Sequence, residues 1–291
     1  MNCALCNSVS LESCVESPDI PQHGERGVSR SIGRIKGLAM ADWKDTSRDA
    51  QRLGSVPRAG GDVAGRVSYD AKYDEGLRGH MLSIYNYMSS GVLLTGIVAL
   101  LAFTSGVAET IFTGGILRWI VALSPLPIVF AMSFGANRFS TGTLQLMFWG
   151  FATLMGLSMS SVFLVYTGGS IATTFFATAA AFAGLSLFGY TTKKNLSGMG
   201  SFLIMGVIGL IVAMVLNMFL QSPAFHYAIS FIGVLIFAGL TAYDTQRLKQ
   251  EYAYLRGTEF AGKAVILGAL SLYLDFINMF QFLLSFLGNR E

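Results

Sequence analysis

The 291-residue chain is 53% hydrophobic and only 13% charged, with a formal net charge of +3 and a mean hydropathy of +0.55. Soluble globular proteins carry about 25% charged residues, so this composition excludes an ordinary soluble domain, and the small net charge gives no indication of nucleic acid as a partner. Of the 37 charged residues, 22 precede residue 81, which leaves 15 for the last 211 residues. This scarcity predicts that residues 81–291 form a membrane domain.

Residues 1–80 are predicted to form a disordered cytoplasmic tail. They are dominated by Gly, Ser, Arg and Asp, and they contain no apolar run long enough for a membrane span or a signal peptide. Met40 is a candidate for the true start of the chain, which would leave residues 1–39 outside the protein. A lone Cys3-Ala4-Leu5-Cys6 pair, without a second pair or neighbouring histidines, favours an inert segment over a metal or redox site.

From residue 81 onwards, seven apolar blocks are predicted to be transmembrane helices. Each is close to the ~20 residues that a helix needs to cross ~30 Å of hydrocarbon, and the short spacers between them require antiparallel neighbours. The predicted fold is therefore an all-α integral membrane bundle of seven helices over residues 81–291. The blocks lie at 81–103, 116–134, 143–166, 170–190, 199–220, 226–243 and 263–288.

Basic residues mark one side of this bundle. The loops on the side of the tail carry most of the Lys and Arg, whereas the loops after the third and fifth blocks carry none. Since cytoplasmic loops are enriched in Lys and Arg, we expect a cytoplasmic N-terminus. The short loops and compact size suggest a bacterial protein, so the expected location is the bacterial inner membrane. With seven spans, Glu291 lies outside the cell, unless the last segment enters the membrane and returns to the same side. The basic residues on the tail side are Arg138, Lys193, Lys194, Arg247, Lys249, Arg256 and Lys263.

The fourth block is crowded with small residues. Small side chains let membrane helices approach closely, so this face is predicted to pack against another helix, and a pore lining is the alternative. The residues are Ala172, Ala177, Ala180, Ala181, Ala183 and Gly184.

Two carboxylates lie inside the predicted spans. An acidic side chain at the centre of a span costs about 2.5–3.5 kcal/mol on insertion scales, so its presence needs a reason. Asp275 lies near the middle of the last block, and Ser271 and Asn278 are predicted to share its helical face as one polar stripe. Asp244 ends the sixth block, three residues before Arg247.

Because the sixth and seventh blocks are consecutive, Asp244 and Asp275 are candidates for a carboxylate pair in the cytoplasmic half. Like charges at close range cannot both ionise cheaply, so such a pair would share a proton and respond to pH near neutrality. Once deprotonated, it would supply the hard oxygen ligands that Ca²⁺ prefers, and a nearby arginine would compete for it as a latch. Each residue also has a simpler interpretation. Asp244 is then hydrated at the helix end or paired with Arg247, Asp275 makes a structural hydrogen bond to a neighbouring helix, and Arg138 only sets the membrane topology.

The chain resembles the Bax inhibitor family of transmembrane proteins over essentially all of residues 78–291. The most specific likeness lies in Tyr243-Asp244-Thr245-Gln246 and in Leu270-Ser271-Leu272-Tyr273-Leu274-Asp275-Phe276-Ile277-Asn278, a motif that is long and unusual for a membrane helix. Further agreement comes from Thr192-Lys193-Lys194-Asn195-Leu196-Ser197 before the fifth block, and from Tyr87-Met88, Gly91 and Thr95 in the first.

The resemblance implies a bundle in which a central, partly polar last helix is wrapped by six others. It also implies a pH-sensitive Ca²⁺ leak governed by a pair of aspartates, which fall on Asp244 and Asp275. The family's latch arginine falls on Arg138, at the end of the second block. The chain departs from the family in its long N-terminal tail and in the 31-residue separation of the aspartates, which predicts an extended cytoplasmic loop.

The leading functional hypothesis is a pH-sensitive calcium leak channel, in which Asp244 and Asp275 bind Ca²⁺ transiently and no cofactor is tightly bound. The alternative is a regulatory membrane protein whose tail binds other membrane proteins, such as a membrane-anchored protease. No enzyme is expected, because Ser158 has no histidine in reach, His226 lies at the far interface, and no G-x-S-x-G, H-E-x-x-H or P-loop motif occurs. The expected partners are the lipid bilayer, Ca²⁺ and protons.

Overall fold

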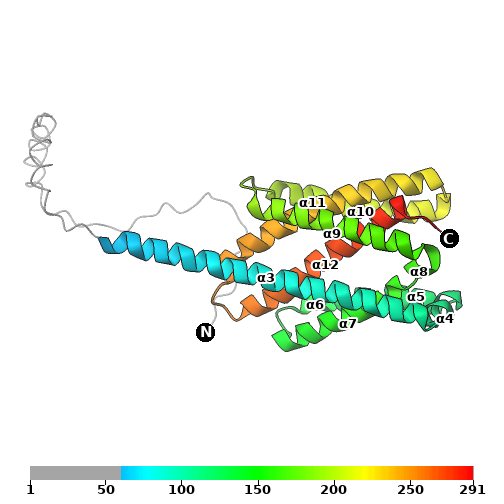
Figure 1. Ribbon diagram of the computed structural model, residues 1–291, viewed down its shortest axis with the longest axis horizontal. Coiled ribbons are helices and arrows are strands. Elements are labelled where there is room, and N and C mark those ends of the chain that lie inside the picture. The colour runs from blue at the N-terminus through cyan, green and yellow to red at the C-terminus, as the bar shows by residue number, and fades with distance from the viewer. Residues whose placement is uncertain (1–59, 291) are drawn as a thin grey trace, which may run out of the picture. The chain divides into compact units, whose positions relative to one another are not determined.

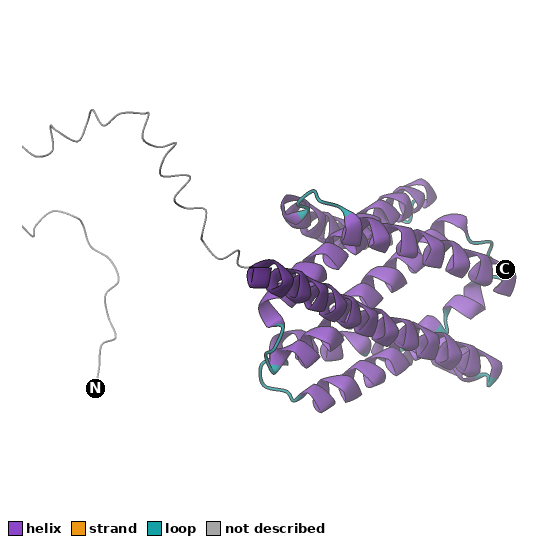
Figure 2. Ribbon diagram, turned by 60° about the vertical axis from the view of Figure 1, so that its left-hand side comes forward, coloured by secondary structure: helices purple, strands orange, loops and turns teal. Residues whose placement is uncertain are grey.

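The computed structural model describes the backbone of residues 60–290 and the side chains of residues 73–290. The predicted tail up to residue 59, with the Met40 start and the three cysteines, lies outside these residues. Every element of the described part is a helix (Figures 1 and 2). The helices are α3 (Gly60–Thr104), α4 (Val107–Thr113), α5 (Leu117–Leu123), α6 (Pro125–Gly135), α7 (Thr141–Met159), α8 (Val162–Val165), α9 (Gly168–Thr191), α10 (Ser197–Leu220), α11 (Pro223–Leu255) and α12 (Phe260–Leu287).

Seven segments of the described chain are long and apolar enough to cross a membrane, which confirms the predicted seven-helix fold. α5 and α6 together form the second span, and α7 and α8 the third. α12 runs for 28 residues without a break, so its length suits a complete span. The spans are Tyr73–Thr104, Leu117–Gly135, Thr141–Val165, Gly168–Thr191, Ser197–Leu220, Pro223–Leu255 and Phe260–Leu287.

The last helix lies at the centre of the bundle, as predicted. In Figure 1, α12 passes between a group formed by α9, α10 and α11 and a group formed by α3, α6 and α7. In its most apolar stretch, 56% of the residues are buried inside the protein, against at most 33% for any other span. Because α12 touches several neighbours at once, its side chains determine how the surrounding helices are placed.

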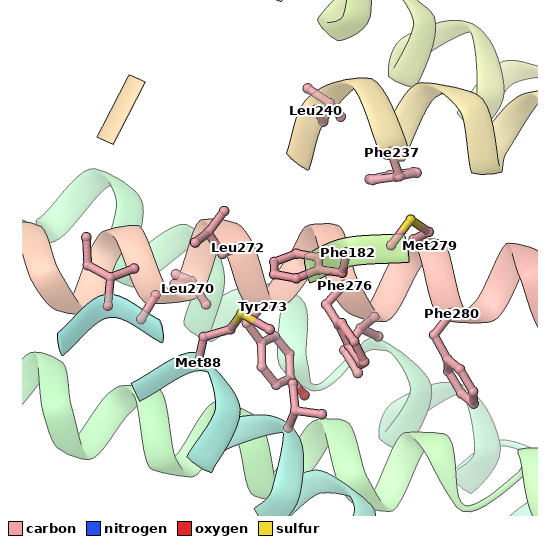
Figure 3. Packing of buried hydrophobic residues seen from close by; sticks show 14 of the residues in the cluster. Met88, Phe182, Phe237, Leu240, Leu270, Leu272, Tyr273, Phe276, Met279 and Phe280 are labelled. Carbon is pink, nitrogen blue, oxygen red and sulfur yellow. The ribbon is translucent and has the colours of Figure 1, made fainter. Parts of the chain in front are cut away.

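Tyr273 of α12 joins the central helix to α3 and α7. Its ring is fully buried and meets Phe148 and Phe151 of α7 edge-on, with ring centroids 6.2 and 5.2 Å away. The hydroxyl of Thr95 donates to the carbonyl of Ala152 at 2.9 Å, so the Tyr273 hydroxyl is the donor in its 2.6 Å bond to Thr95. Figure 3 shows this ring among the buried side chains of α12.

α3 begins at Gly60, which corrects the predicted tail for residues 60–80. Composition suggested too little apolar surface for order in this stretch. Leu77, Met81 and Ile84 nevertheless form a buried stripe with helical spacing, and the ring of Tyr73 lies tilted against that of Tyr252 of α11, with centroids 5.6 Å apart. From Tyr73 onwards, α3 is therefore held by packing against the bundle.

The extended loop that was expected between Asp244 and Asp275 is absent. α11 continues to Leu255 and α12 starts at Phe260, so only a short turn containing Gly257, with φ of 78°, connects them. The sixth apolar block was predicted to end near residue 243, but the polar residues that follow it continue the helix. Arg247 pairs with Glu251 one turn later, and Leu248 is buried.

The turns assigned to the tail side by their charge lie together at one end of the bundle, which we call the basic end. Lys263 Nζ donates to the carbonyl of Ala136 at 3.2 Å, and this joins the start of α12 to the α6–α7 turn. Gln246 bonds the α9–α10 turn through the carbonyl of Lys194 at 2.8 Å. At the opposite end, the far end, the Thr167 amide donates to the carbonyl of Asn289 at 3.2 Å.

The small residues of the fourth block do not form a packing face. All six are exposed, and a Cβ added at Gly184 would meet no atom within 4 Å. The buried stripe of α9 consists instead of Thr174, Thr178, Phe182, Ser186 and Gly189. A close approach occurs at the end of α9, where a Cβ on Gly189 would collide with the backbone of Ala242 in α11. Alanine suits either face of a helix, so composition alone could not identify the buried one.

Substitution of Gly189 tests this contact. Gly189→Ala is expected to lower the stability of the folded chain in detergent by about 1–3 kcal/mol, because its methyl group would force α9 away from α11. Thermal unfolding followed by circular dichroism measures the change. The matched control is Gly184→Ala on the same helix, which should leave stability unchanged or slightly raised. An equal loss in both variants would contradict the close contact.

Candidate functional site

Four successive residues of α11, Tyr243–Gln246, contact four different parts of the bundle. Successive helical residues point about 100° apart, and α11 packs against α9, α10 and α12. The ring of Tyr243 lies against Gly200 of α10, where a Cβ would collide with it. Gln246 holds the α9–α10 turn from both sides, because its Oε1 accepts from the amide of Leu196 and its Nε2 donates to the carbonyl of Lys194, each at 2.8 Å.

Asp244 faces α12 and is only 6% exposed. Its Oδ2 accepts a short hydrogen bond from the hydroxyl of Ser271, and its Oδ1 lies 3.4 Å from Nη1 of Arg247. Nε of the same arginine is 3.2 Å from Oε1 of Glu251, which is as exposed as Arg247 itself, at 42% of each side chain. Arg247 is therefore shared between a buried carboxylate and an exposed one.

Thr245 faces α9 and ends a chain of hydroxyl groups that crosses three helices. Its hydroxyl donates to the carbonyl of Thr241 at 2.8 Å, so Ser186 is the donor in the 3.0 Å bond between Ser186 and Thr245. The Tyr85 hydroxyl of α3 in turn donates to Ser186. This chain fixes α3, α9 and α11 beside the carboxylates.

Asp275 lies within α12, one turn after Ser271, and is 5% exposed. Its Oδ2 is buried and accepts no hydrogen bond from any residue that the structure describes. Asp244 bonds to Ser271, one turn before Asp275, so both carboxylates adjoin the contact between α11 and α12. The structure thus brings Asp244, Ser271 and Asp275 into one buried cluster, and we call these residues with Arg247 the carboxylate cluster. The shared proton stays a prediction.

Arg138 lies outside the carboxylate cluster. It is exposed in the turn between α6 and α7 and forms no ion pair with the residues described. The neighbouring Ala136 contacts Lys263, twelve residues before Asp275, which corresponds to about 18 Å along α12. The arginine at the carboxylates is Arg247, which was one of the alternatives left open for Asp244, and the latch role of Arg138 stays a prediction.

Asn278 does not support the carboxylates. Its Nδ2 donates to the carbonyl of Leu274 in its own helix at 2.8 Å, and its side chain lines a cavity of about 580 Å³ on the far side of Asp275. The cavity is also lined by Ser230, Ser285 and His226. Residues three apart share a helix face, but the Asn278 amide is bonded within its own helix and donates to neither aspartate among the hydrogen bonds of the described residues.

Sequence reasoning missed this far cavity and its hydrogen bonds. Nε2 of His226 lies 3.2 Å from the Arg290 guanidinium and 2.8 Å from the Ser285 hydroxyl. Ser230 donates to the carbonyl of His226, so Ser285 is the donor in its 3.0 Å bond to Ser230. A signal existed in the sequence, because Ser271, Asn278 and Ser285 recur every seven residues along α12. A strict seven-residue repeat runs along a single stripe of a helix.

Comparison with known proteins agrees with this architecture. The profile of the family described as "Inhibitor of apoptosis-promoting Bax1" matches residues 77–291. An uncharacterized protein of Caulobacter vibrioides is 50% identical over 234 residues, covering 76% of this chain and 93% of its own length. The inner membrane protein YbhL of Escherichia coli K12 is 44% identical over 219 residues, covering 74% of this chain and 94% of its own.

A double-mutant cycle tests the bond between Ser271 and Asp244. Ser271→Ala should destabilise the chain by about 1.5–3 kcal/mol, as expected for a buried hydrogen bond to a charged group. In the Asp244→Asn background the same change should cost much less. Ser83→Ala is the control, since Ser83 donates only to the carbonyl of Gly79 in its own helix. Additive losses in the double variant would contradict the contact.

Proposed function

The chain belongs to the Bax inhibitor family of membrane proteins, and we propose that it is a pH-sensitive Ca²⁺ leak channel of the bacterial inner membrane. One observation supports this proposal above the others. Asp275 is buried at the centre of a seven-helix membrane bundle beside a second carboxylate, with an oxygen that accepts no hydrogen bond from the described residues. A structural aspartate would be expected to have its oxygens bonded, whereas a carboxylate that binds protons and ions in turn needs a free one.

In the closed state, we propose, Asp244 is ionised and Asp275 is neutral. The charge of Asp244 is balanced by Arg247 and by the hydroxyl of Ser271. A charged carboxylate that is buried without a donor costs several kcal/mol, so Asp275 is expected to hold a proton there. Removal of that proton would place two negative charges within the carboxylate cluster, and a single arginine cannot neutralise both.

Opening is proposed to use the second partner of Arg247. Because its guanidinium already touches Glu251, Arg247 can leave Asp244 without losing its ion pair. The freed carboxylates would then offer oxygen ligands to Ca²⁺. Ca²⁺ takes six to eight oxygen ligands, and no three His, Cys, Asp or Glu residues gather among the described residues. A passing ion would therefore keep part of its water and bind transiently.

The route from the far end is proposed to run through the far cavity. A smaller cavity of about 260 Å³ shares Asn217 and His226 with it and also borders the exposed Arg290. The stacked rings of Phe237 and Phe282 line the far cavity with centroids 5.8 Å apart. Phe237 lies two turns before Asp244, and Phe282 lies two turns after Asp275, so this aromatic pair is placed to narrow the route between the far end and the carboxylates.

We propose a cytoplasmic N-terminus and transport without catalysis. The basic end carries Lys193, Lys194 and Lys263, and the excess of positive charge in cytoplasmic loops sets orientation. The carboxylates would then lie on the cytoplasmic side, where protons of the cytosol reach them, and the far cavity would face outside.

The proton dependence of the leak is the first test. The full chain is reconstituted into liposomes that contain a Ca²⁺ indicator, and flux is measured from about pH 6 to about pH 8. Flux of the wild type should rise several-fold with pH, because Asp275 loses its proton as pH rises. Asp275→Asn mimics the neutral acid and should stay at the low flux throughout.

The matched control is Asp74→Asn, which removes an exposed carboxylate near the start of the first span and should retain the wild-type response. Circular dichroism and size-exclusion profiles of each variant establish that it is folded. A wild-type pH response in folded Asp275→Asn would contradict the mechanism.

The two arginines are distinguished by a second test. Arg247→Gln should raise Ca²⁺ flux several-fold at about pH 6, because Asp244 loses the charge that neutralises it. Arg138→Gln should leave flux unchanged, since Arg138 makes no ion pair in the part of the chain described. The same liposome assay measures both. If Arg138→Gln opened the channel and Arg247→Gln did not, the latch would be Arg138.

A further inference from the structure

A second cavity lies between α3 and α9, apart from the proposed ion route. Its volume is about 680 Å³, within the range of sites that hold small molecules. The two walls run antiparallel, with Arg78 and Tyr190 at one end and Leu93 and Phe175 at the other. Leu93 is 65% exposed and Leu187 is 64% exposed, so the groove opens on the outer surface of the bundle, where lipid replaces water.

The length of the groove corresponds to one leaflet of a bilayer. Arg78 and Leu93 are fifteen residues apart on α3, which is about 22 Å along the helix. A bilayer with its headgroups is about 40–45 Å thick, so each leaflet is about 20–22 Å. The opposite wall on α9, from Phe175 to Tyr190, has the same length.

The chemistry of the lining changes along this length. Most of the groove is formed by Met, Leu, Val, Ala and Phe side chains, whereas Arg78 is the one charged residue among those that line it. Arg78 is exposed, lies toward the start of the first span and makes no ion pair with the residues described. Its neighbour Leu77 borders a further cavity that includes Lys249. An apolar groove with the cationic side chain of Arg78 at the level of the headgroups is complementary to a phospholipid that carries a negative charge.

We propose that the groove between α3 and α9 binds an anionic phospholipid from the leaflet at the basic end. One acyl chain lies between Met88 and Ala183, and the phosphate meets the guanidinium of Arg78, whose planar fork suits phosphate oxygens. The lipid is a bound ligand of the closed bundle and does not lie on the ion route.

The floor of the groove places this lipid beside the carboxylate cluster. Phe276, the residue after Asp275, lines the groove and meets Phe182 of α9 edge-on at 5.6 Å (Figure 3). Tyr85 and Ser186, whose hydroxyls connect α3 to α9 and then to Thr245, also line it. A lipid in this position would contact the helices that hold the cluster.

The test is lipid retention by the full chain, measured by native mass spectrometry from detergent. The protein is mixed with equal amounts of dioleoyl phosphatidylglycerol and dioleoyl phosphatidylcholine. The wild type should retain one phosphatidylglycerol in preference. Arg78→Gln should weaken that preference about tenfold, the size of one charge-assisted hydrogen bond. Ala183→Trp fills the groove and should abolish retention of both lipids.

Ala180→Trp is the matched control, because Ala180 is exposed on the same helix but does not line the groove. It should retain phosphatidylglycerol as the wild type does. Equal retention in all four proteins, or equal loss in the two Trp variants, would overturn the proposal. So would a dimer that Ala183→Trp dissociates, since a second copy would then occupy the groove. Arg78→Gln alone decides the matter if Ala183→Trp fails to fold, and none of these readouts depends on Ca²⁺ flux.

Discussion

The architecture depends on how a bilayer protein satisfies a buried carboxylate. Inside the membrane no water is available to partner an ionised side chain, so every partner must come from the protein. Asp244 obtains them from Ser271 on the neighbouring helix and from Arg247 on its own. This requirement draws α11 onto the central α12, and the residues that flank Asp244 then attach the remaining neighbours. Thr245 bonds Ser186 of α9, and Gln246 holds the α9–α10 turn.

The polar groups of the bundle interior form two clusters. The carboxylate cluster lies toward the basic end, and the far cavity, which the stacked rings of Phe237 and Phe282 line together with Asn278 and His226, lies toward the opposite end. In the proposed mechanism, Arg247 moves from the buried Asp244 to the exposed Glu251, which it already contacts. The proposed lipid groove between α3 and α9 is lined by Phe276, the residue that follows Asp275.

The spans could be predicted because length and hydropathy decide which segments cross a membrane, and all seven blocks became helices of that kind. The burial of Asp275 could be predicted because a carboxylate that faces lipid is energetically unfavourable. Features that depend on packing could not be predicted. Hydropathy reports where a helix leaves the apolar layer, not where it ends, so the extension of α11 to Leu255 was missed. The exposure of the α9 alanines depends on helix rotation, and the partner of Asn278 depends on local packing; composition determines neither.

We propose that Asp275 carries a proton in the closed bundle and loses it when the leak opens. Infrared difference spectroscopy of the reconstituted chain tests this directly, because a protonated carboxyl has a carbonyl stretch that a carboxylate lacks. Asp275→Asn and Asp244→Asn assign the band, and titration with flux measured on the same vesicles shows when it disappears. We expect an acid band that belongs to Asp275 and disappears over the pH range in which flux rises. An Asp275 that is ionised at every pH while the leak stays closed would contradict it.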